Sequence, residues 1–283
     1  MLSIICTGII LAFSWAYTLW TLSSPERMQF FNYVMLAPAP IAFCFYLYES
    51  RSLKKALRPL TNIPSFGSLC FSILFPPVFL SLLALLVLVF GLGTYNQDNL
   101  FQIIKFLPKG SGLVFAMFLL IGEEYAWRGY LLPRFTEAWG PIVATTVIGF
   151  IWAIWHGPLV YGLASKLGTT DSPLFLSIVQ MGAVFILSFP FAYAYFKSGS
   201  IIPPVIIHFL WNWLNPAILG NVYRNQPGII AGNLLYINGE TIAGVALGSL
   251  FVFWFIWQVS KRSTFSNLRL FQNVKRESYK VPT

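Results

Sequence analysis

The chain consists of long apolar runs separated by short polar stretches. A transmembrane helix needs about 20 mainly apolar residues, and by that measure the sequence predicts about eight such helices. They cover residues 2–22, 30–48, 67–92, 111–135, 141–163, 173–196, 201–219 and 241–259. The stretches between them hold turn-forming residues, such as TNIPSFG at 61–67 and NGE at 238–240. The pattern therefore predicts an all-α protein, a bundle of about eight transmembrane helices.

The composition agrees with this pattern. Only 10% of the 283 residues are charged, whereas 57% are hydrophobic and 18% are aromatic. A soluble domain averages about 25% charged residues, so this chain has too little charge to cover a globular surface. We therefore expect a multi-pass integral membrane protein. A single helical domain is predicted over residues 1–260, followed by a basic tail over 261–283.

The basic residues lie mainly in the short stretches between apolar runs. The formal net charge is +9, but no basic face is interleaved with base-stacking aromatic residues, so we expect no nucleic-acid partner. In the eight-helix arrangement, 12 of the 18 Lys and Arg residues fall on one side of the membrane and five on the other. Because short cytoplasmic loops carry an excess of Lys and Arg, both termini are predicted to be cytoplasmic. The tail either touches anionic lipid or is a solvated end.

Two adjacent glutamates lie within an apolar run, in the sequence AMFLLIGEEYAWRGYLLPRF. The other seven acidic residues lie in polar stretches, at helix ends or in the tail, so Glu123 and Glu124 are the two carboxylates predicted to be buried. A charged side chain at a helix centre costs about 2.5–3.5 kcal/mol on insertion, and such residues are candidates for function. Glu124 and Arg128 can pair on one helical face, as a functional or a purely structural ion pair. Glu123 is rotated by about 100° and can face a cavity.

Both histidines of the chain also lie in apolar runs. His156 occurs in FIWAIWHGPLVYG and His208 in PPVIIHFLWNWLNP, where Asn212 follows four residues later on the same helical face. Taken singly, each histidine could be a core residue whose hydrogen bonds are satisfied within the protein, and Asn212 could form a hydrogen bond between helices. Taken together with Glu123, they favour a catalytic site, because each buried polar group costs free energy that packing alone does not require.

These side chains allow a narrow range of chemistry. A carboxylate and an imidazole can hold and deprotonate a water molecule. A second imidazole and a carboxamide can donate hydrogen bonds to a developing oxyanion. No serine or cysteine shows a recognisable nucleophile motif. Water is therefore the expected attacking group, and hydrolysis of an amide or ester is the expected reaction.

At these residues the sequence resembles the type II CAAX prenyl endopeptidase family of intramembrane proteases, also called the CPBP or Abi family. The family's Glu-Glu-x-x-x-Arg motif, usually followed by Gly, matches Glu123, Glu124, Arg128 and Gly129. Its Phe-x-x-x-His motif matches at His156, although Trp152 replaces the phenylalanine.

The third motif of the family, His-x-x-x-Asn, matches His208 and Asn212. The three motifs occur in the family's order, within a core of about residues 111–219. The resemblance implies an all-α bundle of about eight helices around a polar cavity. It also implies that Glu123 and His156 activate the water and that His208 and Asn212 stabilise the oxyanion. Glu124 and Arg128 would support them.

Members of this family are often described as metalloproteases. If a metal such as zinc is bound, its ligands would be Glu123, His156 and His208. Catalytic zinc usually has three protein ligands, but zincins place both histidines on one helix at His-Glu-x-x-His spacing. Here the two histidines are 52 residues apart. We therefore predict a glutamate-activated water with no obligatory cofactor.

The predicted function is an intramembrane endopeptidase that acts in the lipid bilayer on a membrane-associated peptide or protein, with no obligatory protein partner evident. Two alternatives stay open. A member of the same family could act in bacteriocin immunity or as a scaffold without proteolysis. A proton-coupled transporter could also use buried Glu and His, but it should show paired halves with corresponding broken helices, and the sequence shows no such symmetry.

Overall fold

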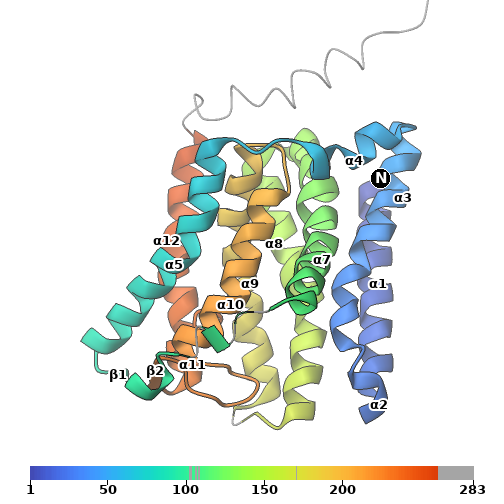
Figure 1. The fold of residues 1–283 in the computed structure, drawn as a ribbon. Helices are drawn as coiled ribbons and strands as arrows, with labels where there is room; N and C mark the ends of the chain where they lie inside the picture. Colours follow the sequence, from blue (N-terminus) through green and yellow to red (C-terminus); the bar gives the residue numbers. More distant parts are fainter. Residues whose placement is uncertain (102–103, 106, 108, 170, 261–283) are drawn as a thin grey trace, which may run out of the picture.

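The computed structural model describes residues 1–101, 104–105, 107, 109–169 and 171–260. In this part the chain is almost entirely helical (Figure 1), which confirms the all-α prediction. The longer helices are α1 (Leu2–Leu22), α3 (Pro38–Ser50), α4 (Leu53–Thr61), α5 (Phe66–Val89), α7 (Ser111–Glu124), α8 (Leu132–Leu167), α9 (Pro173–Phe196), α10 (Ile202–Leu219) and α12 (Ile242–Ser260). The tail predicted at 261–283 lies outside the described residues.

Short elements connect the long helices. They are the α-helical turns α2 (Pro25–Met28) and α11 (Leu234–Ile237), the 3-10 helices η1 (Phe31–Leu36) and η2 (Gln97–Asn99), and the π-helix η3 (Tyr125–Leu131). Two strands, β1 (Gly93–Tyr95) and β2 (Ile230–Gly232), pair antiparallel, with Thr94 opposite Ala231. This small ribbon lies at the end of the bundle that also holds α2 and α11 (Figure 1).

Six segments of the described chain are helical, long and apolar enough to cross a membrane. They are Leu2–Leu22, Phe31–Ser50, Phe66–Val89, Ser111–Leu167, Pro173–Phe196 and Leu234–Val259. The 57-residue segment contains two of the predicted helices, 111–135 and 141–163. The predicted helix at 201–219 forms α10, which is not among the six. All eight predicted runs thus fold as helices, in a polytopic membrane protein.

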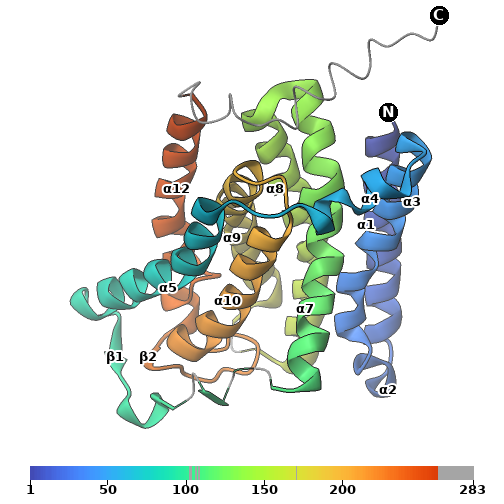
Figure 2. The same ribbon diagram turned by 45° about the horizontal axis from the view of Figure 1, so that its top comes forward.

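The long segment from α7 through α8 reverses direction at Gly140. This residue has φ 78° and ψ 166°, which interrupts the helix, and a positive φ costs glycine little because it has no Cβ. Pro141 follows and begins the second part of α8 without needing a backbone donor. The chain turns back at the top of the bundle (Figure 2). The second part of α8, with Trp152 and His156, therefore returns beside the end of α7, where Glu123 lies.

The distribution of apolar and charged side chains is that of a protein dissolved in lipid. Large apolar side chains are exposed along the outer helix faces, for example at Phe13, Leu85, Phe118 and Phe253. Conversely, the motif residues Glu123, Glu124 and Arg128 are fully buried. In water the opposite arrangement is favourable, so the exterior is suited to hydrocarbon.

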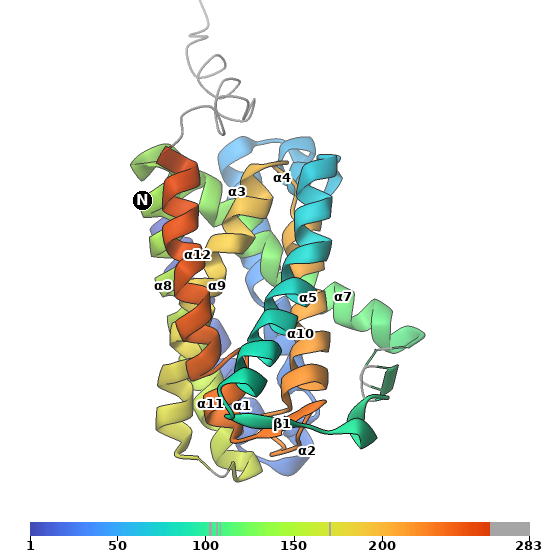
Figure 3. The same cartoon turned by 90° about the vertical axis from the view of Figure 1, so that its left-hand side faces the viewer.

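The three motif-bearing elements converge because of how the helices pack. α8 lies along α9, and α10 lies beside α5 (Figure 3) and contacts α7. The start of α10 carries Pro203 and Pro204 in its first turn, where proline needs no hydrogen-bond acceptor. Met1 and the end of α12 lie at the same end of the bundle (Figure 1). Which side of the membrane this end faces stays a prediction.

Candidate active site

Glu124 and Arg128 form a closed ion pair inside the bundle. Glu124 ends α7, and Arg128 lies four residues on in the π-helix η3. The Arg128 Nη1 atom is 3.0 Å from each carboxylate oxygen of Glu124, and both side chains are fully buried. The His208 Nδ1 atom, from α10, lies 2.9 Å from Glu124 Oε1. The predicted pairing is confirmed, and we call Glu124, Arg128 and His208 the ion-pair cluster.

Aromatic rings complete the surroundings of Arg128. Its guanidinium carbon lies 3.9 Å from the centroid of the Trp152 ring and 4.6 Å from that of the Phe191 ring. Its Nε and Nη2 atoms have no hydrogen-bond partner among the described residues. A desolvated cation is attracted to aromatic faces, so Glu124 and the two rings together compensate for the burial of this charge.

Glu123 faces away from the ion-pair cluster. Its Oε1 atom accepts a hydrogen bond of 2.5 Å from Trp152 Nε1, which joins the end of α7 to α8. Its Oε2 atom is buried and has no hydrogen-bond partner among the described residues. The side chain lines a cavity, as the helical geometry predicts. One carboxylate oxygen is thus held in place while the other is left for a ligand in the cavity.

His156 is oriented by its own helix. Its Nδ1 atom lies 2.9 Å from the backbone oxygen of Trp152. A carbonyl oxygen can only accept, so we assign the proton to Nδ1, which leaves Nε2 as an acceptor. The imidazole also contacts the Trp152 and Trp155 rings edge to face, with centroids 5.4 and 4.7 Å away. These contacts fix the ring with its free nitrogen at the cavity.

α10 supplies two more groups to the same cavity. His208 and Asn212 are one turn apart and both line it. The Nδ1 atom of His208 belongs to the ion-pair cluster, so its Nε2 atom is the nitrogen left for the cavity. Asn212 is exposed to the cavity, and its carboxamide has no hydrogen bond to another described residue. Both groups are available to a ligand.

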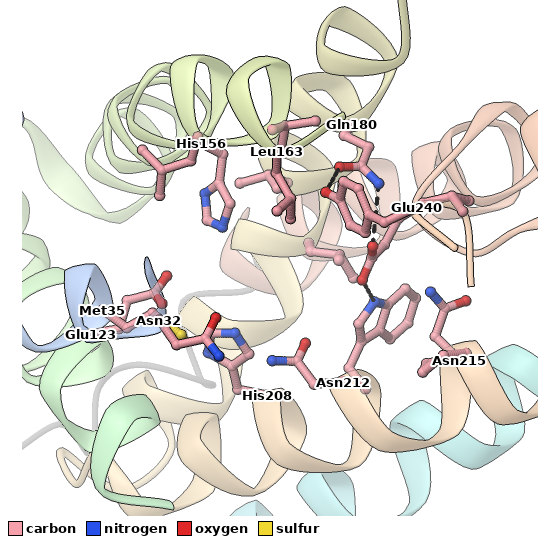
Figure 4. A pocket seen from close by; sticks show the side chains of 18 of the residues that line it. Asn32, Met35, Glu123, His156, Leu163, Gln180, His208, Asn212, Asn215 and Glu240 are labelled. Atoms are coloured by element: carbon pink, nitrogen blue, oxygen red, sulfur yellow. Dashed lines mark hydrogen bonds between the residues drawn. The ribbon is translucent and has the colours of Figure 1, made fainter. Parts of the chain in front are cut away.

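The cavity has a volume of about 310 Å³ and brings the predicted residues together. Glu123, His156, His208 and Asn212 all line it, and Figure 4 shows His208 and Asn212 on the floor of the view, with Glu123 and His156 to the left. Glu124 and Arg128 are not among its lining residues, and Glu124 contacts His208, which is one of them. The structure therefore separates the six predicted site residues into a cavity group and a supporting group.

A further carboxylate reaches the cavity from a partly buried position, while Glu123 and Glu124 are, as predicted, the buried acids of the described residues. Glu240, in the polar stretch before α12, also lines the cavity, on the side away from Glu123 (Figure 4). Its Oε1 atom accepts from Trp211 Nε1 at 3.2 Å, and its Oε2 atom accepts from Gln180 Nε2 at 3.4 Å. The sequence NGE indicates a turn, and a turn is normally exposed. The long-range contacts that fold it inward are not visible in the sequence.

A neutral tyrosine orients Gln180 toward this carboxylate. The Tyr223 hydroxyl donates to Gln180 Oε1, so the amide nitrogen of Gln180 turns to Glu240. Tyr223 lies in the loop after α10, where burial, and secondarily the nearby Glu240 charge, raise the pKa of its hydroxyl above the usual value. The hydroxyl therefore keeps its proton and remains a donor.

The fit of a metal ion can be judged from the positions of possible ligands. In the described part of the chain, no three His, Cys, Asp or Glu side chains form a group that could hold one metal ion. Glu123, His156 and His208 line a common cavity, and each has one atom engaged with a protein partner (Trp152 Nε1, the Trp152 carbonyl and Glu124 respectively) and one atom left toward the cavity. Their positions in the described structure do not form the three-ligand group that the family resemblance would allow for zinc.

The fold and the cavity define a class of protein: a polytopic α-helical membrane protein with a polar site enclosed by its bundle. Comparison with known proteins shows what the chain is similar to. Residues 105–214 match the family model described as "Type II CAAX prenyl endopeptidase Rce1-like". The chain is also similar to the CAAX prenyl protease 2 of Methanococcus maripaludis, with 31% identity over 155 residues. The resemblance to this protease family is thereby confirmed over the segment that carries the three motifs.

The matched regions cover part of each chain. The alignment with the archaeal relative includes 50% of this chain and 53% of the relative, so the chain spans about half the length of that protein. The family match begins before α7 and ends within α10. It contains Glu123, His156, His208 and Asn212, but ends before Glu240.

Proposed function

We propose that the chain is an intramembrane endopeptidase that hydrolyses a peptide bond in a membrane-associated peptide or protein. The observation that carries the proposal is the single cavity lined by Glu123, His156, His208 and Asn212. A carboxylate, two imidazoles and a carboxamide around one space are the groups that attack by water requires. The names of the matched family and of the archaeal relative support the same class of reaction.

Glu123 is the proposed general base. Trp152 holds one of its carboxylate oxygens, while the other has no protein partner among the described residues. His156 presents Nε2 from the same side of the cavity (Figure 4). A water bound between these two groups would donate one proton to each and present its oxygen lone pair to a substrate carbonyl. Glu123 would then accept the proton as the new bond forms.

His208 and Asn212 are the proposed donors to the oxyanion. The Glu124 carboxylate stabilises a proton on Nδ1 of His208, and a doubly protonated ring also donates from Nε2. The Asn212 amide supplies a second donor from the same helical face. Both would strengthen their hydrogen bonds as negative charge develops on the carbonyl oxygen, which is how such donors accelerate a reaction.

The reaction is balanced with these groups. The water oxygen bonds to the carbonyl carbon, its proton passes to Glu123, and the carbonyl electron pair moves onto the oxygen held by His208 and Asn212. When this intermediate collapses, the carbon–nitrogen bond breaks and Glu123 returns the proton to the leaving nitrogen. The products are a carboxylic acid, which keeps the second proton of the water, and an amine, with no redox change.

The deciding experiment is cleavage of membrane-associated peptides by the purified protein in lipid vesicles. We expect specific fragments from the unsubstituted protein and none from Glu123→Gln. A matched control is Glu137→Gln, which removes a carboxylate that pairs with Arg134 away from the cavity; it should cleave normally. Cleavage by Glu123→Gln at the full rate would contradict the mechanism. Proton-coupled solute flux without peptide cleavage would instead favour a transporter, and neither activity would favour a non-proteolytic member of the family.

No step of this mechanism uses a metal, and that point has its own test. We expect turnover to be unchanged after prolonged dialysis against a chelator, because no three His, Cys, Asp or Glu side chains of the described residues form a group that could hold one metal ion. Metal content and rate would be measured on the same sample. Stoichiometric zinc, with activity that is lost on its removal and restored on its addition, would overturn the prediction.

A further inference from the structure

The cavity has an acidic position that the proposed reaction does not use. Glu240 lies in the turn that leads into α12, and that turn is fixed to α10. The Glu240 backbone N–H donates to Asn238 Oδ1 at 2.8 Å, and the Gly239 N–H donates to Asn215 Oδ1 at 3.0 Å. The Asn238 side chain in turn donates to the Gly220 carbonyl at 2.7 Å. The carboxylate is therefore presented to the cavity by an ordered backbone.

The side chains that donate hydrogen bonds to this carboxylate in the described structure carry no charge. Trp211 Nε1 and Gln180 Nε2 each donate one hydrogen bond to it, and both donors are neutral. A carboxylate has about four acceptor sites, so part of its capacity is unused. Among the described residues, no lysine or arginine forms an ion pair with Glu240.

The whole cavity has the same charge bias. Two carboxylates, Glu123 and Glu240, line it, and its described lining includes no lysine or arginine. The Glu123 Oε2 atom, on a fully buried side chain, also lacks a partner there. The titratable nitrogen groups in the cavity lining are the imidazoles of His156 and His208. His208 already faces the carboxylate of Glu124. A charge held away from water is stabilised most by an opposite charge, so the cavity favours a cationic group in its ligand.

The distance between Glu240 and the proposed reaction centre can be estimated along α10. His208, at the centre, is followed on the same side of the helix by Trp211 and Asn215, which hold the Glu240 carboxylate and the turn before it. With a rise of about 1.5 Å per residue, these positions lie roughly 4.5 and 10.5 Å along the helix from His208. An extended peptide advances about 3.3 Å per residue. Glu240 is therefore within reach of a residue about three places or fewer from the scissile bond.

We propose that Glu240, supported by Trp211 and Gln180, is a specificity subsite that binds a Lys or Arg side chain of the substrate within about three residues of the scissile bond. This inference rests on the proposed function for its scissile bond, but binding alone can test the subsite.

The test measures binding in the Glu123→Gln background, where cleavage is not needed and Glu240 is the carboxylate left in the cavity lining. Fluorescent transmembrane peptides would differ at one position only, carrying Lys, acetyl-lysine, norleucine or Glu. A hydrogen-bonded charge pair is worth roughly 1.5–3 kcal/mol, which corresponds to about ten- to a hundredfold in affinity. We expect the Lys peptide to bind tighter than the norleucine peptide by that factor. Adding Glu240→Gln should remove the preference, and Glu137→Gln should retain it.

A second measurement keeps the proposal testable if Glu240→Gln does not fold. On the Glu123→Gln protein with Glu240 intact, n-butylammonium should displace the Lys peptide, whereas n-butanol at the same concentration should not. Equal affinity for Lys and norleucine peptides, or a Lys preference that survives Glu240→Gln, would overturn the subsite. A Glu240-dependent preference without cleavage by the unsubstituted protein would sustain the subsite and remove the proposed protease. Cleavage that is indifferent to Lys would do the reverse.

Discussion

Glu123 and Glu124 are neighbours in the sequence but belong to two different regions of the molecule. Glu124 lies in the ion-pair cluster, where Arg128 contacts both of its oxygens and His208 contacts one. Glu123 lies in the cavity wall, which consists of Glu123, His156, His208 and Asn212. Among the described residues, the single hydrogen-bond partner of Glu123 is the neutral Trp152, and one carboxylate oxygen is unpaired. A carboxylate whose charge is compensated is suited to hold structure. One that is not compensated is suited to take a proton.

His208 connects the two regions. Its Nδ1 atom is in the ion-pair cluster and its ring lines the cavity. The ion-pair cluster can therefore stabilise a proton on the His208 imidazole without contacting a substrate. If this division is correct, substitutions in the cavity wall should lower the rate at constant stability, and substitutions in the ion-pair cluster should lower stability as well.

The largest expected effect in the cavity wall is that of Glu123→Gln. The change retains the shape and the acceptor for Trp152 but removes the base, so we expect turnover to fall by about 10⁴-fold, the upper end of what a general base contributes. Thermal unfolding in detergent should stay close to that of the unsubstituted protein. Residual turnover within tenfold of normal would assign the proton transfer to another group. It would also show that Glu123 and Glu124 do not differ in the roles assigned to them here.

The largest expected effect in the ion-pair cluster is that of Arg128→Met. Removing the cation leaves Glu124 buried without it, which typically costs about 3–5 kcal/mol of unfolding free energy. The control is Arg134→Met, which breaks a partly exposed pair with Glu49 of 2.9 Å and should cost about 0–1 kcal/mol. Equilibrium unfolding of both variants measures the difference. Equal losses would show that burial does not distinguish the cluster from a surface pair.

Asn212→Ala tests a member of the cavity wall whose carboxamide has no hydrogen-bond partner among the described residues. Loss of one oxyanion donor typically lowers turnover by about 10²–10³-fold, less than we expect for Glu123→Gln, with little change in substrate binding. The control is Asn32→Ala, which removes a carboxamide that lines the same cavity from η1. If Asn212 serves instead as a contact between helices, its loss should cost roughly 0.6 kcal/mol of stability and leave kcat normal.

Local spacing in the sequence predicts part of this arrangement. The separation of four residues places Glu124 against Arg128, and the rotation of Glu123 turns it to the cavity; both follow from helix geometry. The eight apolar runs likewise predict the helices. Spacing could not place His208 on Glu124, because the two are 84 residues apart. The pattern of apolar residues also does not predict the π-helix η3.

Glu240 shows more sharply where sequence interpretation ends. Its neighbours Asn238 and Gly239 are turn formers, and the interpretation of this stretch as a turn is correct. The turn is nevertheless folded into the bundle, because Asn215 of α10 binds the Gly239 backbone and Trp211 binds the carboxylate. Those contacts depend on how the helices pack, which a local pattern does not contain.

Trp152→Phe has the smallest expected effect and is informative because phenylalanine is the residue of the family motif. The ring can still face Arg128 and His156, but the N–H donor to Glu123 Oε1 is lost. A hydrogen bond to a charged group contributes about 1.5–3 kcal/mol, and part of that holds the base in position. We therefore expect kcat to fall by roughly tenfold, with KM nearly unchanged.

The matched control for this change is on the same helix. Trp155 also lines the cavity, and its Nε1 atom has no hydrogen-bond partner among the described residues. Trp155→Phe removes the same atoms without removing a hydrogen bond to the base, so its kcat should change less than that of Trp152→Phe. If both variants behave alike, the loss reflects packing around the imidazole. If Trp152→Phe alone is slow, the indole of Trp152 positions Glu123, a role that a phenylalanine at this place cannot perform because its ring has no donor.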